Sequence, residues 1–121
     1  MGNRAIIVST GVRTTVTVGI YVHWFNRQAL WDAIKEMMSR GYRDPADDAE
    51  YGMARLCQIL CEQNPDGLNI GLTTVDIGDP HCADGLDVGL IAVDYSGIFR
   101  VAWNDECPYL FEAYSFEEEE D

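Results

Sequence analysis

Residues 16–24 show the pattern that most restricts what this chain can fold into, because strongly apolar side chains occupy every second position without a break. One face of this segment would carry Val16, Val18, Ile20, Val22 and Trp24. A period of two, built from β-branched and aromatic residues, is typical of a strand that buries one face. We therefore predict a strand here.

Further strands are predicted on both sides of this segment. Residues 5–8 form a short apolar run, and apolar side chains alternate again over residues 68–72. Residues 90–93 and 98–103 have the same character and are joined by a short turn sequence, which favours a hairpin. Residues 104–116 carry spaced aromatic side chains and are interpreted as a late strand or as an arm that docks on a neighbour.

Two helices are predicted between the second and third strands. Asn26 suits an N-cap, and Gly41 suits the position just after a helix. The first apolar stripe comprises Leu30, Ala33, Ile34, Met37 and Met38. For the second helix, Asp44 is the expected cap and Pro45 the expected first residue, with a stop at residues 64–67. Its stripe comprises Met53, Leu56, Cys57, Leu60 and Cys61.

The resulting order, β-β-α-α-β-β-β, predicts an α+β fold with a mostly antiparallel sheet and two helices inserted after the second strand. We expect a single domain over residues 1–116, followed by a disordered acidic tail at 117–121. Helices on one face would leave the other face of the sheet open. A second subunit is the expected cover for that face, which predicts a homodimer or higher homo-oligomer.

Charge is distributed very unevenly along the chain. Residues 1–60 hold seven bases and six acids, whereas residues 61–121 hold one base and fifteen acids, so almost all of the net charge of −13 lies in the second half. This balance excludes a basic nucleic-acid-binding domain, and direct binding to DNA or RNA is not expected. No apolar run reaches the ~20 residues of a membrane span. The acidic half instead suggests either solubility or mimicry of nucleic acid.

Three kinds of chemical site were weighed and set aside. Cys57 and Cys61, at helical spacing, could join His81 and Cys82 as zinc ligands, but cysteines on an apolar stripe are more often buried thiols. A cysteine–histidine pair could be formed by His23 or His81 with Cys82 or Cys107, yet adjacent residues such as His81 and Cys82 rarely have the required geometry. Asp76, Asp79, Asp84 and Asp87 could bind a divalent metal, although a plain turn-rich loop is the favoured explanation. We therefore expect no metal, no cofactor and no enzymatic activity.

A basic and aromatic group is the remaining candidate. Trp24, Phe25, Asn26 and Arg27 lie where a predicted strand meets a helix, whose first N–H groups suit an anion. Arg55 on the second helix could grip a phosphate, and an aromatic ring beside arginines can hold a nucleotide base. An arginine on a helix is otherwise usually a solvated surface residue. Arg100 is the only base that the second half of the chain offers to a phosphate.

Four short segments resemble a known family of small phage and prophage proteins. They are Met1-Gly-Asn-Arg-Ala-Ile-Ile-Val8, Ile20-Tyr-Val-His-Trp24, Tyr51-Gly-Met-Ala-Arg-Leu-Cys-Gln58 and Cys82-Ala-Asp-Gly-Leu-Asp87. On these residues the chain is similar to the first described Thoeris anti-defence family, over about residues 1–100. The opening segment and the segment ending in Trp24 carry most of the resemblance.

The resemblance implies a non-catalytic α+β oligomer that sequesters the cyclic ADP-ribose signal made by a bacterial Toll/interleukin-receptor-domain sensor. Some members of the family also hold cyclic oligonucleotides. Arg27 and Arg55 would match arginines on the family's first and second helices, and the loop over 77–87 would match the loop that closes over the ligand. The chain departs from the family at Ile77, where an aromatic residue is expected, and at Asp87, where an amide is usual.

The sequence thus predicts a phage protein that acts in the host bacterial cytoplasm and binds a cyclic nucleotide immune signal without degrading it. Its predicted ligand-binding residues are Trp24, Phe25, Asn26, Arg27, Arg55, Ile77, Asp87 and Arg100. Because sequestration needs only affinity, no general base is required. The alternative hypothesis is an acidic inhibitor that binds a host defence complex, such as a CRISPR effector, by mimicking nucleic acid.

Overall fold

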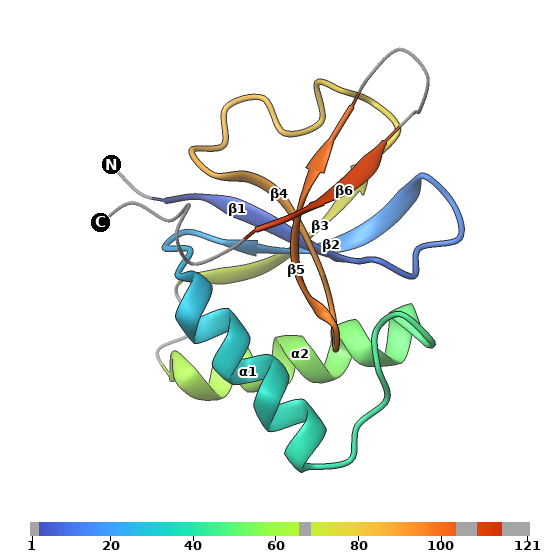
Figure 1. Ribbon diagram of the computed structural model, residues 1–121. Coiled ribbons are helices and arrows are strands. Elements are labelled where there is room, and N and C mark those ends of the chain that lie inside the picture. Colours follow the sequence, from blue (N-terminus) through green and yellow to red (C-terminus); the bar gives the residue numbers. More distant parts are fainter. Residues whose placement is uncertain (1–2, 66–68, 104–108, 115–121) are drawn as a thin grey trace.

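The computed structural model describes residues 3–65, 69–103 and 109–114. In this part of the chain, six strands form one sheet, and two helices form a layer on one side of it (Figure 1). The elements are β1 (Ala5–Ser9), β2 (Val16–Val22), α1 (Arg27–Ser39), α2 (Ala49–Gln63), β3 (Ile70–Asp76), β4 (Gly89–Asp94), β5 (Gly97–Ala102) and β6 (Leu110–Ala113).

The six strands lie in the order β3-β2-β1-β4-β5-β6. Every neighbouring pair is antiparallel except β1 and β4, which are parallel because the two helices and β3 intervene between them in the chain. The α+β fold with a mostly antiparallel sheet is therefore confirmed. The structure adds β6 where the sequence left a strand or a docking arm, and the predicted tail at 117–121 lies outside the described residues.

Helix α1 begins where the sequence predicts. The side chain of Asn26 accepts a hydrogen bond from the N–H of Ala29 (2.8 Å), which satisfies a donor that the first turn leaves unpaired. Gly41 follows the helix with a φ of 74°, a conformation that glycine adopts without strain. The apolar stripe of α1 joins the core cluster that includes residues of the sheet, except that Met38 is exposed.

The predicted start of the second helix is wrong. Asp44 and Pro45 form a turn that is tied to the end of the sheet, so α2 begins four residues later. The carboxylate of Asp44 accepts a hydrogen bond from the N–H of Tyr95 (3.1 Å), and the Pro45 carbonyl accepts one from the Ser9 hydroxyl (2.6 Å). Asp48 is the actual N-cap. Long-range contacts thus outweigh a favourable local start signal.

The second face of the sheet is covered rather than open. The loop between β3 and β4 crosses this face, on the opposite side from the helices (Figure 1). Its residues Ile77, Cys82 and Ala83 join a second apolar cluster with Val8 and Val101 of the sheet. The expectation that the helices leave this face open is therefore wrong within the described residues, and the homo-oligomer stays a prediction.

The apolar face of β2 is buried only in its middle. Ile20 and Val22 are almost inaccessible, whereas Val16, Val18 and Trp24 are 55%, 53% and 55% exposed. Helix α2 packs against β1 and β2 and covers the centre of that face without reaching its ends. The predicted strand is confirmed, and its apolar face is packed only in part. In the described residues, neither helix is long and apolar enough to cross a membrane.

Candidate functional site

The junction between β2 and α1 presents an exposed aromatic ring beside a capped helix start. Trp24 follows β2 and is held by a bridge to Asn3, and its ring meets the ring of His23 edge-on, with centroids 5.0 Å apart. Phe25 turns inward and is buried in the helical core. Asn26 then caps α1. The local sequence therefore directs one aromatic side chain outward and the next inward at the point where the helix begins.

A cavity of about 420 Å³ lies at this junction, between the start of α1, the end of α2 and the ends of β2 and β3. Its volume is within the range of small-molecule sites in proteins. Trp24 and Phe25 contribute aromatic surface, and Ile7, Leu30 and Leu60 contribute aliphatic surface. Five carboxamide side chains also line it: Asn26, Gln28, Gln63, Asn64 and Asn69.

Several of these carboxamides are fixed by bonds through their nitrogen atoms. The side-chain nitrogen of Gln28 donates to Asp32 (2.8 Å), that of Gln63 to the Ala29 carbonyl (3.3 Å), and that of Asn64 to the Leu60 carbonyl (2.9 Å). Their oxygen atoms are thereby left as acceptors. Asp32 is the single ionisable side chain among the residues of this lining. An aromatic face with several neutral acceptors suits an uncharged heterocycle such as a nucleotide base.

Arg27 is buried beside this cavity and serves the fold. Its Nε donates to the backbone carbonyl of Tyr114 (2.6 Å), and its guanidinium carbon lies 5.8 Å from the centre of the Tyr114 ring. The guanidinium carbon of Arg100 lies 3.9 Å from the same ring centre, and Phe25 stacks near it with centroids 6.1 Å apart. The structure therefore brings three of the predicted site residues together around Tyr114, which the sequence did not single out.

Arg55 lies elsewhere in the molecule. Its guanidinium carbon lies 5.9 Å and 5.5 Å from the ring centres of Tyr42 and Tyr51, and its Nη1 donates to Gln58 (2.7 Å). Tyr42 follows the end of α1, whereas Arg27 opens that helix, so the two arginines are separated by roughly 20 Å along α1 at 1.5 Å per residue. Within one subunit, the structure does not bring them to a common cavity.

Ile77 and Asp87 lie in the loop on the far face of the sheet. Ile77 is fully buried, and its carbonyl accepts a hydrogen bond from the indole of Trp103 (2.6 Å). The carboxylate of Asp87 pairs with the Arg4 side chain (3.0 Å), and these bonds hold the pKa of Asp87 below its ordinary value. Both residues therefore anchor the loop to the sheet, and neither lines the cavity beside Trp24.

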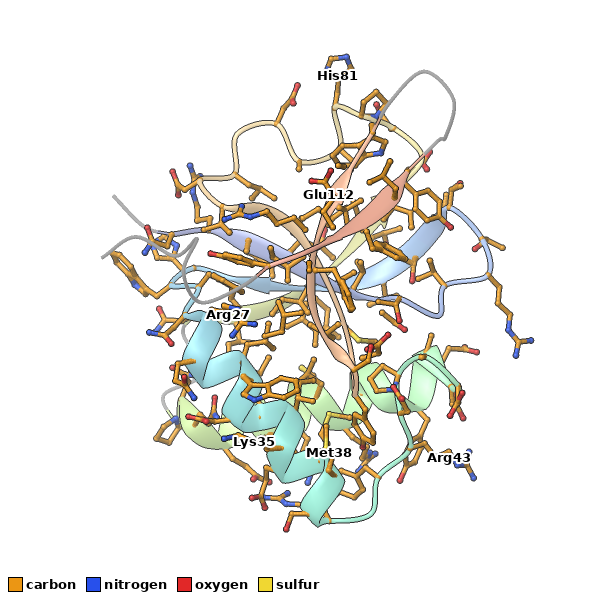
Figure 2. All side chains as sticks on the ribbon, viewed as in Figure 1. Arg27, Lys35, Met38, Arg43, His81 and Glu112 are labelled. Carbon is orange, nitrogen blue, oxygen red and sulfur yellow. The ribbon has the colours of Figure 1, made fainter. Side chains whose placement is uncertain are left out.

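The cysteines and histidine weighed as metal ligands are divided between the two faces. Cys57 lies on α2, whereas Cys82 packs in the cluster on the far face, and His81 lies at the outer end of the loop there (Figure 2). Burial, with Asp79 and Asp76 nearby, raises the pKa of Cys82 to about 11, which disfavours its thiolate. In residues 3–65, 69–103 and 109–114, no three His, Cys, Asp or Glu side chains are placed to hold one metal ion.

Comparison with known proteins adds nothing to this geometry. No protein-family model matches the chain, and neither a curated protein nor a solved structure matches it. Function therefore has to be inferred from the cavity itself. Sequence analysis found its aromatic side and its cap, Trp24 and Asn26. It missed Gln63 and Asn69, because they come from separate elements and no local pattern marks them.

Proposed function

We propose that this protein binds a cyclic nucleotide immune signal of the cyclic ADP-ribose type and sequesters it intact. It would do so as a homodimer or higher oligomer in the host bacterial cytoplasm. The observation that carries the proposal is the cavity beside Trp24, which combines an exposed aromatic ring with five carboxamides. A base would stack on Trp24 and present its amino and ring-nitrogen edge to the carboxamides.

The negatively charged part of the ligand would face the start of α1. The first turn of that helix contributes Asn26, Gln28 and Ala29 to the cavity, and the N-terminal end of a helix attracts anions through its free N–H groups. No bond in the ligand needs to break, because removal of a signal requires only affinity. A nanomolar Kd corresponds to about 12 kcal/mol, which a pocket with stacking and several hydrogen bonds can supply.

Release of bound ligand tests the proposal. The purified protein is incubated with a mixture of cyclic ADP-ribose isomers and cyclic oligonucleotides, washed and heat-denatured, and the released compounds are identified by mass. We expect one compound to be released unchanged. A converted product would mean an enzyme, and no bound compound would contradict the proposal. If no compound is bound, the acidic mimic of nucleic acid becomes the hypothesis to test. It predicts binding to host defence complexes that weakens steeply as the salt concentration rises.

Substitution of Trp24 locates the ligand. We expect Trp24→Ala to lower affinity about thirtyfold, because stacking on an aromatic side chain is worth about 1–3 kcal/mol per base. Met38→Ala is the matched control, since Met38 is also an exposed apolar side chain but lies at the opposite end of α1 (Figure 2). Equal affinity in both variants, measured by calorimetry, would exclude this cavity as the binding site.

A further inference from the structure

A second hollow opens at the other end of the apolar face of β2. It is a groove of about 960 Å³ between the first half of α2 and the strands β2 and β3. Val16, Val18 and Leu72 form part of its floor, and Leu72 is 68% exposed. Large aliphatic side chains that cluster on an exposed surface mark an interaction site more often than isolated ones do.

The uncovered width of the sheet beside α2 matches one helix. Helices pack 8–10 Å apart whereas strands lie about 4.8 Å apart, so one helix covers about two strands. With two helices on six strands, the outer part of β2 and the edge strand β3 are left bare. The wall that α2 presents to the groove includes Ala49, Met53 and Cys57, which recur every four residues and so form one stripe. Ala49 and Cys57 have small side chains, which allow another helix to approach closely.

The acidic charge at the rim of the groove favours a helix with basic side chains. Asp47, Asp48 and Glu50 line the groove against a single base, Arg13. Asp48 is paired with Arg43 (2.9 Å), but neither Asp47 nor Glu50 forms an ion pair with another described residue. Because the rim of the groove is mainly acidic, it would attract a basic partner.

We propose that this groove docks a basic amphipathic helix of another protein, which lies beside α2 as a third helix on the sheet. The apolar side of the partner helix covers Val16, Val18 and Leu72. Its lysines or arginines face Asp47 and Glu50. This surface shares no residue with the cavity beside Trp24, so either proposal can fail without affecting the other.

The direct test is binding of a fluorescent synthetic peptide of about 18 residues, with leucines along one helical face and lysines on the other. A peptide of identical composition in scrambled order, without an apolar face, is the control for simple charge attraction. At about 0.15 M salt, we expect the amphipathic peptide to bind at least tenfold more tightly than the scrambled one. Equal binding of the two peptides would overturn the proposal.

Matched variants locate the docked peptide. We expect Leu72→Ser to weaken binding about tenfold, since burying a leucine is worth about 1.5 kcal/mol, and Met38→Ser to leave it unchanged. Glu50→Lys should weaken it several-fold, whereas Glu112→Lys, on the opposite edge of the sheet, changes the net charge equally and should have little effect. Equal effects within either pair would overturn the proposal. So would a homodimer in sedimentation that Leu72→Ser dissociates, because a second copy would then fill the groove.

Discussion

The two ends of the apolar face of β2 have different surroundings, although they belong to one uninterrupted alternation. At the Trp24 end, the cavity is bounded by two helix termini and is lined with carboxamides. At the Val16 end, the groove is broader, its floor is aliphatic and its rim is acidic. Only Ile20 and Val22, between them, are buried under the helical layer.

This difference follows from where α2 crosses the sheet. A helix covers about two strands, so α2 buries only the middle of the apolar face of β2. The chemistry at each end of that face is therefore set by the neighbouring elements. Near Trp24 these neighbours are helix ends, which bring polar side chains and free backbone groups. Near Val16 they are the side of a helix and an edge strand, which bring apolar surface. One apolar face therefore ends in two surfaces of different chemistry.

The largest expected effect is on stability along β2 itself. Ile20→Ala should lower the free energy of unfolding by about 3 kcal/mol, because it leaves a cavity under α2. Val18→Ala removes a similar side chain two residues away, where it is already exposed, and should cost about 0.5 kcal/mol or less. Urea denaturation followed by circular dichroism measures both. Similar losses for the two variants would mean that the groove is closed in solution.

The next largest effect is on the stability contributed by buried Arg27, compared with that of exposed Arg13 near Val16. Arg27→Ala should lower the free energy of unfolding by about 2–3 kcal/mol, because it removes a buried charged donor from the Tyr114 carbonyl. Arg13→Ala, at the Val16 end, deletes an exposed arginine and should change stability by less than about 0.5 kcal/mol. The same denaturation measurement applies. A loss in Arg27→Ala no larger than that in Arg13→Ala would contradict the structural role of Arg27.

The smallest effect concerns the loop on the far face of the sheet. The pKa of Asp87 is lowered by its bonds to Arg4, so its contribution to stability is present above the ordinary carboxyl pKa of about 4 and is lost as the pH falls through its lowered value. Asp87→Asn should therefore reduce the loss of stability on acidification below about pH 4. Asp47→Asn, without an ion pair in the described structure, is the control. Identical pH profiles for wild type and Asp87→Asn would refute the effect.

Local patterns were sufficient for most of the fold. Alternation located the strands, and the cap at Asn26 with the glycine at position 41 located α1. They failed where tertiary contacts compete with local preference. Asp44 and Pro45 have a good start signal, but bonds to Tyr95 and Ser9 hold them in a turn. The second face of the sheet is covered by the loop between β3 and β4, whose sequence has no regular apolar pattern that would predict packing.

The candidate site could be predicted only in part. Trp24 and Asn26 are neighbours in sequence, so their joint position at a strand–helix junction could be inferred. The carboxamides of Gln63 and Asn69 reach the same cavity from other elements, and only the tertiary structure brings them there. Arg27 and Arg55 were equally good candidates to bind a phosphate. Whether each is buried, and how far apart they lie, depends on how the helices pack, which the local sequence does not reveal.

The most direct test of the cavity is an NMR titration of the labelled protein with cyclic ADP-ribose isomers. The signals to follow are the indole N–H of Trp24 and the side-chain amide groups of Asn26 and Asn69, since all three residues line the cavity. We predict that these signals shift together and saturate, while the amides of residues 77–87 do not change. Shifts confined to residues 77–87, or no shifts at any ligand concentration, would contradict the account.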